Sequence, residues 1–332
     1  MKETPTQDQI FGMENAVDFK RTAFTDVPQP FIFAVIQKPT PEEALLEMHQ
    51  SERAGAHAFE LNLAWMLDEY RTAKALAPLF RRTTLPTVTT YRRYGREATD
   101  AVATAAPDDV KRMELQLQLV DVGCSGYDLE LDTFDPQPRH DMSSPEGIAY
   151  AMNPESYPAE ITEDSEAVEK QMRLIEETHA RGGEVLASTH ALTRLPIDKA
   201  LWICKLAEER GADALKIVRF NAIMEDIVDT LATTVALRRQ AEIPFVMMAM
   251  GECGKLARIT SALMGSMLVH SKRDYWPGAF TDQPLIRDVK AAFESIDYKI
   301  NQRAEEYWPE WLAQSEIDSS IDLKSLLNGQ LT

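Results

Sequence analysis

The chain of 332 residues lacks several features that would mark common classes of protein. It has three cysteines, Cys124, Cys204 and Cys253, which are widely spaced and form no CxxC or metal-finger pattern. Neither a disulfide framework nor a structural zinc site is therefore expected. No apolar run approaches the roughly 18 residues of a membrane span. Residues 1–28 hold no apolar core of signal-peptide length. We therefore expect a soluble, cytoplasmic protein with free thiols.

Positive charge is also scarce. Lysine and arginine total 35 against 53 aspartates and glutamates, a formal net charge of −18, and the basic residues form no stripe. Nucleic acids and anionic membranes attract basic patches, so neither is expected as a partner. An anionic substrate would need local arginines. The hydrophobic content of 44% is enough for a large core, and the length suits two domains or one α/β barrel with additions.

Short apolar or β-branched runs alternate with longer helical patterns along the chain. Helix-like stretches with apolar residues at three-and-four spacing include 40–56, 196–212 and 222–242, and several end in a Gly-Ala or Gly-Gly turn. The strand-like runs are 31–37, 58–63, 86–93, 126–132, 184–191, 214–220, 244–250 and 266–272. Eight such units predict a (β/α)8 TIM barrel, with a doubly wound open sheet as the alternative.

A barrel places its chemistry at the carboxyl ends of its strands, and several of these runs carry polar residues there. Lys216 is the most informative, because it enters an apolar run directly after a small-residue turn in GADALKIV (211–218). Burial disfavours the charged ammonium, so this lysine is a candidate imine-forming nucleophile, although a lysine that snorkels to water is the alternative. The other polar residues in or after these runs are Glu60, Asn62, Arg92, Arg93, Asp128, Glu130, His190 and Arg258.

Two segments interrupt the alternation. Residues 133–164 are rich in proline, serine and acid, and they are too long for a plain turn after the fourth strand. They predict a lid or pocket wall, or else a solvated excursion. From residue 301, the aromatic residues Tyr307, Trp308 and Trp311 suit a tail that docks on the barrel or on a second subunit. We expect an N-terminal extension over 1–28, a barrel over 29–300, a helical extension over 301–332, and a homodimer.

Ordered motifs along residues 30–300 resemble the type I 3-dehydroquinate dehydratases, which are Schiff-base (β/α)8 barrel enzymes of the shikimate pathway and of aromatic amino acid biosynthesis. The motifs are FELNL, TYR, DLEL, STH followed by TRLP, GADALKIV, MGECGKLARI, MGS and WPG. The resemblance implies a dehydratase, a carbon–oxygen lyase, acting on 3-dehydroquinate or a related cyclic hydroxy-ketone acid. Its substrate would be a small anionic keto acid, and no cofactor or metal is expected.

The resemblance also assigns roles to single residues. Lys216 would form the imine with the substrate ketone, and His190 would be the general acid and base. Arg258 matches the family's carboxylate-binding arginine, a task that suits its forked donors. Glu60 and Arg92 match positions that hold substrate hydroxyls. The substrate-binding set is completed by Asn62, Glu130, Tyr275 and Ala279. The remaining histidines, expected at the surface or in packing, are His49, His57, His140, His179 and His270.

The chain departs from the family at recognition positions. Asn62 stands where the family has an arginine. Arg96, with Glu97 one place on, stands where the family has a glutamate that supports the histidine. Tyr275 and Ala279 replace a serine and a glutamine of the last loop. The imine and proton-transfer residues are kept, which predicts a related substrate. Two alternatives stay open: a class I aldolase-type retro-aldol cleavage through the same imine, and a non-catalytic barrel that binds a shikimate-type metabolite.

Overall fold

Eight parallel strands form the centre of the molecule. The computed structural model describes residues 22–92, 108–136, 145, 149–150, 153, 160–191, 195–276 and 281–296. The strands are β1 (Phe31–Ile36), β2 (Ala58–Asn62), β3 (Thr87–Thr90), β4 (Gly126–Glu130), β5 (Glu184–Ala191), β6 (Ala214–Phe220), β7 (Phe245–Met250) and β8 (Leu268–Ser271). They pair in the order β7-β6-β5-β4-β3-β2-β1-β8. Every predicted strand run contains one observed strand.

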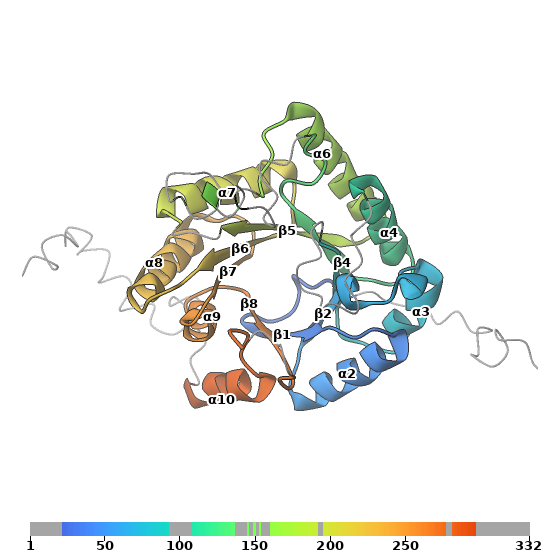
Figure 1. Ribbon diagram of the computed structural model, residues 1–332, viewed down its shortest axis with the longest axis horizontal. Coiled ribbons are helices and arrows are strands. Elements are labelled where there is room, and N and C mark those ends of the chain that lie inside the picture. The colour runs from blue at the N-terminus through green and yellow to red at the C-terminus, as the bar shows by residue number, and fades with distance from the viewer. Residues whose placement is uncertain are drawn as a thin grey trace, which may run out of the picture. The chain divides into compact units, whose positions relative to one another are not determined.

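The two edge strands of this order meet at one end, so the sheet is a nearly closed barrel. The backbone N–H of Met267, just before β8, donates to the carbonyl of Phe245 in β7 at 2.7 Å. The N–H of Met247 donates to Ser266 Oγ at 3.0 Å. Figure 1 shows the strands around a common centre with the helices outside them. The predicted (β/α)8 barrel is confirmed.

Helices follow the strands, and several of them have ordinary capping contacts at their ends. They are α2 (Pro41–Ala54), α3 (Ala73–Arg81), α4 (Asp109–Asp121), α6 (Ser165–Ala180), α7 (Ile197–Arg210), α8 (Glu225–Gln240), α9 (Gly254–Leu263) and α10 (Ile286–Ile296), with short 3₁₀ turns η1 (Leu63–Trp65) and η2 (Asp68–Tyr70). The hydroxyl of Thr40 accepts from Glu43 N–H at 3.3 Å before α2. Gly55 ends α2 and Gly211 ends α7, both with a left-handed backbone that glycine tolerates best. The Gly-Ala turns predicted from the sequence thus end these helices.

Much of the barrel interior is apolar. One buried cluster draws residues from β1, β2, β3, β5, β6, β7 and β8, which is possible only for side chains that point to the barrel axis: Phe31, Phe33, Ala58, Val88, Leu186, Ala214, Val218, Val246, Met248 and Leu268. Phe24 and Val27, which precede β1 and belong to the expected N-terminal extension, join this cluster. Glu184 at the start of β5 accepts from the N–H of Phe24 at 2.6 Å. The segment before β1 therefore closes the amino-terminal end of the barrel.

Buried polar side chains share this interior toward the carboxyl ends of several strands. Because side chains on a strand alternate in direction, a residue two positions after an inward apolar residue also points inward. Five of those positions hold Glu60, Thr90, Ser188, Lys216 and His270, while Asp128 lies two positions after Gly126 on β4, and all six are buried. A (β/α)8 barrel carries its site at this carboxyl end of the strands. The strand alternation therefore gathers the candidate site residues inside the barrel.

Candidate active site

Lys216 lies in the middle of β6 and points into the barrel, and only 3% of it is exposed. Its Nζ forms an ion pair with Asp128 Oδ2, from β4 on the other side of β5. Ser188 of β5 is the register partner of Lys216 and lies between the two strands. The ammonium is therefore held inside the barrel by a carboxylate and does not extend to the surface.

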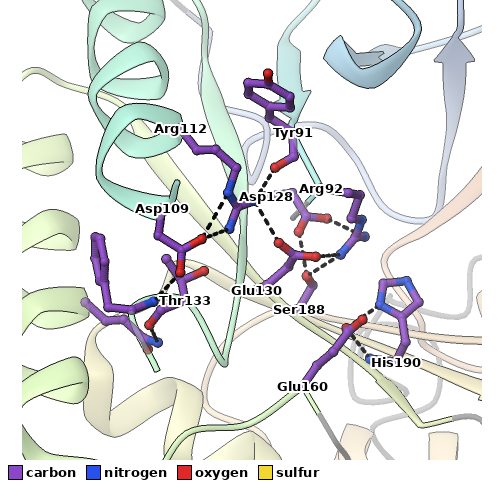
Figure 2. Close-up of polar contacts among 12 residues, drawn as sticks. Tyr91, Arg92, Asp109, Arg112, Asp128, Glu130, Thr133, Glu160, Ser188 and His190 are labelled. Atoms are coloured by element: carbon purple, nitrogen blue, oxygen red, sulfur yellow. Dashed lines mark hydrogen bonds and ion pairs between the residues drawn. The ribbon is translucent and has the colours of Figure 1, made fainter. Parts of the chain in front are cut away.

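Asp128 is the centre of this group of contacts. Besides Lys216, it accepts a hydrogen bond from Ser188 Oγ at 2.5 Å and one from Arg92 Nη2 at 3.3 Å. Burial alone would raise the pKa of the Asp128 carboxyl, but Arg92, Lys216 and Ser188 together hold this pKa well below its usual range. Asp128 is therefore an anion at neutral pH and serves as the counter-ion of Lys216. Figure 2 shows its contacts with Arg92 and Ser188.

Two arginines bind Glu130 at the end of β4. Arg92 Nη1 donates to Glu130 Oε1 at 3.4 Å and to Ser188 Oγ at 3.3 Å. Arg112 of α4, which is only 1% exposed, donates to Glu130 Oε2 at 2.8 Å and to Asp109 Oδ1 at 2.8 Å. Figure 2 shows Glu130 between the two guanidinium groups. Glu130, expected to bind substrate, thus holds Arg92 in place.

Arg112 was missing from the expected site, although the sequence carries a signal for it. It falls on the buried face of α4 together with Met113, Gln116, Leu119 and Val120. An arginine on the apolar face of an amphipathic helix needs a buried acidic partner. Glu130 is that partner.

His190 lies one residue before the end of β5, and its side chain is 21% exposed. Its Nδ1 lies 2.6 Å from Glu160 Oε2, and its backbone N–H donates to the same oxygen at 2.9 Å (Figure 2). Burial raises the pKa of Glu160, but His190 and Arg92 lower this pKa by more, and the result is about 2. The carboxylate therefore accepts a hydrogen bond from Nδ1–H, and Nε2 is the ring nitrogen on the side away from Glu160.

Glu160 comes from the end of the long segment after β4, for which a lid or wall and a solvated excursion were the alternatives. Ile161 and Thr162, which follow it, are fully buried. Thr162 N–H donates to the carbonyl of Leu131 at 3.1 Å, and its own carbonyl accepts from Arg210 Nη2 at 2.6 Å. These contacts hold the described end of the segment against the barrel, where it forms part of the wall beside His190.

A second histidine, His270 of β8, lies inside the barrel. Its Nε2 is 2.7 Å from Glu60 Oε2, and its ring packs edge-on against Phe33 at 5.1 Å between centroids. Burial raises the pKa of Glu60, but His270 and Lys216 lower it more, and the result is about 2. Burial lowers the pKa of His270 itself, against the attraction of Glu60. His270 was expected at the surface or in packing; it packs against Phe33 and also contacts a predicted substrate-binding residue.

Arg258 lies in α9 and is buried. Its Nε donates to the carbonyl of Ala249 at 2.9 Å, and its Nη2 donates to Asp282 Oδ2 at 3.0 Å. The arginine that was expected to bind the carboxylate of a substrate thus contacts a carboxylate of the chain itself.

The remaining expected residues take other places. Asn62 is buried, and its Oδ1 accepts from Ala64 N–H at 3.0 Å at the start of η1. Tyr275 is exposed, its hydroxyl donates to the carbonyl of Gln283 at 2.8 Å, and Lys255 Nζ lies 5.1 Å from its ring centroid. The expected residues that lie outside the described parts of the chain are Arg93, Arg96, Glu97, His140, Ala279, Tyr307, Trp308 and Trp311.

An aromatic wall lies beyond the ends of β1, β2 and β8. Trp276 packs edge-on against Trp65 at 6.2 Å between centroids. Lys272 Nζ lies 4.2 Å from the Trp276 ring centroid and donates to Gln37 Oε1 at 2.9 Å. The two tryptophan rings and the ammonium of Lys272 therefore pack together after these strands.

Metal ligands and membrane spans were sought in the described ranges only. There, no group of three histidine, cysteine or acidic side chains is arranged to hold a metal ion. None of the helices described is both long and apolar enough to cross a membrane.

Comparisons with solved structures agree with this fold. The 3-dehydroquinate dehydratase of Geobacillus kaustophilus aligns with 86% of this chain and 98% of its own, at a TM-score of 0.64 and 18% identity. A type I 3-dehydroquinate dehydratase of Clostridium difficile, crystallised with covalently modified comenic acid, aligns with 84% of this chain and 96% of its own, at a TM-score of 0.63 and 14% identity. At such identities the likeness establishes the barrel fold.

Sequence comparisons reach the family. A 3-dehydroquinate dehydratase of Klebsiella pneumoniae is 30% identical over 103 residues, which cover 30% of this chain and 41% of the relative. One from Alkaliphilus oremlandii is 29% identical over 141 residues, 41% of this chain and 52% of the relative. The chain thus matches about half or less of the length of these relatives. The model of the family described as type I 3-dehydroquinase, however, matches residues 32–298. With a match over most of its length, the chain belongs to the type I 3-dehydroquinase family.

Proposed function

We propose that this chain is a Schiff-base-forming dehydratase that acts on 3-dehydroquinate or a related cyclic hydroxy ketone. The observation that carries the proposal is the pairing of two groups on neighbouring strands, the buried Lys216–Asp128 ion pair and the His190–Glu160 contact. An imine needs a lysine inside the barrel, and the dehydration needs a proton carrier beside it. Membership of the dehydratase family supports the same reaction class.

In the first half of the reaction, Lys216 forms the imine. After its ammonium passes a proton to water, the Lys216 amine attacks the carbonyl carbon of the ketone. The resulting carbinolamine takes a proton back from water and loses its hydroxyl as water, which forms an iminium ion. One positive charge on nitrogen replaces another at nearly the same position. Asp128 is kept anionic by Arg92 and Ser188, so the carboxylate that balanced the ammonium then stabilises the iminium.

In the second half of the reaction, His190 transfers the protons. Its Nε2 removes a proton from the carbon next to the iminium, and the electron pair moves onto nitrogen to give an enamine. The enamine expels the β-hydroxyl, which leaves as water with the proton from His190. Water then hydrolyses the imine, which releases the enone and restores Lys216. Glu160 stabilises the imidazolium between the two proton transfers, through the 2.6 Å contact with Nδ1.

The alternatives make different use of these groups. A retro-aldol lyase would also need the Lys216 imine, so product analysis must separate it from a dehydratase. A barrel that only binds a metabolite would gain nothing from a buried lysine, because burial of its charge has an energetic cost. The two acidic partners, Asp128 and Glu160, are arranged for proton and charge movement, which favours a reaction over simple binding.

Borohydride trapping tests the proposal. The protein would be incubated with 3-dehydroquinate and sodium borohydride, digested, and examined by mass spectrometry, while enone formation is followed by ultraviolet absorbance. A reduced adduct on the peptide containing Lys216 is expected. Lys272→Met is the matched control, since Lys272 is also a buried lysine, and its adduct should still form on Lys216. An adduct that persists in Lys216→Ala would disprove the assignment, and cleavage of a carbon–carbon bond would favour the aldolase.

A further inference from the structure

Arg258 is a buried cation beside the interior in which Lys216 lies. Its guanidinium is 5% exposed, and its charge contributes to lowering the pKa of His270, which points into the barrel. A buried guanidinium next to a bound molecule is expected to attract an anionic group of that molecule, because its forked donors fit a carboxylate. What the guanidinium already contacts therefore determines which group it can bind.

Each nitrogen of this guanidinium faces an acceptor of the chain. Nε donates to the carbonyl of Ala249 at 2.9 Å, Nη1 lies 3.2 Å from the sulfur of Met248, and Nη2 donates to Asp282 Oδ2 at 3.0 Å. Asp282 neutralises the charge, since its side chain is 14% exposed and solvent screens the pair only weakly. A second carboxylate brought to Arg258 would have to displace Asp282 or accept its repulsion.

A second feature holds Asp282 in this position. A side-chain carbon built onto Gly254, the first residue of α9, would lie 3.4 Å from Asp282 Cβ, so Asp282 adjoins the amino-terminal end of this helix. Cys253 at the N-cap makes no capping hydrogen bond with its side chain within the described chain. The amino end of a helix attracts negative charge. Asp282 is therefore attracted by both the arginine and the helix end.

We propose that Asp282 is a specificity-determining residue that neutralises Arg258 and directs the site to ketones with an uncharged polar group at this position. The inference rests on the proposed dehydratase function and narrows its substrate class. It departs from the expectation of an anionic keto acid. The arginine that would bind the substrate carboxylate is already paired with the carboxylate of Asp282. A hydroxyl or an amide of the substrate can accept from Arg258 and donate to Asp282. An ester can accept from Arg258 and adds no charge, whereas a carboxylate meets a like charge.

The test compares an acid and its neutral ester on one ring. We would measure kcat/KM for 3-dehydroquinate and for its methyl ester with the wild type, Asp282→Asn and Asp282→Ser. The wild type should prefer the ester. The acid-to-ester ratio should rise by about 10- to 100-fold in both variants, the range expected for a freed charge-assisted contact. Asp274→Asn is the matched control, because it removes the same charge from the same connection between β8 and α10, but at a carboxylate paired with Arg273.

Each outcome decides the proposal. A wild type that prefers the acid, or an acid-to-ester ratio that rises no more in the Asp282 variants than in Asp274→Asn, would overturn it. If the protein turns over neither compound, calorimetry gives the dissociation constants of the acid and the ester. The ratio of these constants then replaces the ratio of kcat/KM values. If no ketone leaves a borohydride adduct on Lys216, the dehydratase function fails, while the binding ratio still decides the role of Asp282. If adducts form and the ratio does not move, only the role of Asp282 fails.

Discussion

Replacing Glu160 by glutamine would test whether the segment after β4 supports proton transfer. The amide keeps the shape of the side chain but removes the charge that faces His190 Nδ1 at 2.6 Å. It can also turn its NH2 group toward the ring and favour the wrong tautomer. The imidazolium formed during the reaction would then lose its charged partner, while the Lys216–Asp128 pair stays as it is.

The size of the effect follows from the contacts. Glu160 Oε2 accepts hydrogen bonds from both Nδ1 and the backbone N–H of His190, at 2.6 and 2.9 Å. A hydrogen bond to a charged group contributes about 1.5–3 kcal/mol. If that amount is lost from the transition state, kcat falls by about 10- to 150-fold. Imine formation, which does not need His190, should proceed at the wild-type rate.

The assay separates the two steps. Turnover of the preferred ketone is followed by enone absorbance, and imine formation is followed by the rate of borohydride trapping in a single turnover. Glu166→Gln is the control, since Glu166 is an exposed residue of α6 that pairs with Lys170 and exposed pairs contribute little. A kcat for Glu160→Gln within about twofold of the control would refute the reasoning. An equal loss of trapping and turnover would show that Glu160 acts through the fold instead.

Four further predictions follow from the structure. Lys216→Ala should abolish trapping and lower kcat by at least about 10³-fold, which the enone assay would show, because no other amine can replace the imine nitrogen. The native pKa of Glu60, about 2 against an ordinary 4.5, contributes about 3 kcal/mol of stability above pH 4.5. This contribution is lost as the pH falls toward 2, so urea unfolding of Glu60→Gln should depend less on pH in that window. Gly126→Ala should destabilise the protein by at least about 1–3 kcal/mol in urea unfolding, because its Cβ would lie 2.1 Å from the carbonyl oxygen of Glu184. With Asn62, Tyr275 and Ala279 in place of the family's polar residues, kcat/KM for 3-dehydroquinate should lie below about 10⁴ M⁻¹s⁻¹ in steady-state assays, and a higher value would indicate an ordinary family substrate.

Much of the barrel could be predicted because its signals are local. Buried parallel strands read as short apolar runs between longer amphipathic stretches, and each run contained its strand. The apolar run after the turn in GADALKIV predicted a buried Lys216, with a lysine that snorkels to water as the alternative, and Lys216 lies inside the barrel two residues after Ala214. The alternation of side chains along a strand could also have placed His270 inside, two residues after Leu268. His270 was instead expected at the surface or in packing, because it matches no catalytic residue of the family. The third run was too long, since β3 ends at Thr90, ahead of Arg92.

The other site residues depend on contacts that sequence patterns do not encode. Glu160 lies 30 residues from His190, at the end of a long segment whose path the composition does not specify. Asp282 lies 24 residues from Arg258, and it meets the guanidinium only after β8 and the following turn are in place. Arg112 was the exception, because its position on a buried helix face was readable. Local patterns thus gave the strands, while the charge partners required the folded barrel.

The contact between Glu184 and the segment before β1 also constrains the order in which the chain can fold. The N–H groups of Phe24 and Thr25 donate to Glu184 Oε2 at 2.6 and 3.2 Å, across 160 and 159 residues of sequence. During synthesis, the amino-terminal segment leaves the ribosome long before its acceptor exists, and such distant contacts form slowly. The floor of the barrel is therefore sealed only after β5 has been added. A nascent chain without β5 would lack Leu186, which packs in the same buried cluster as Phe24 and Phe31, so these two rings would be less well covered.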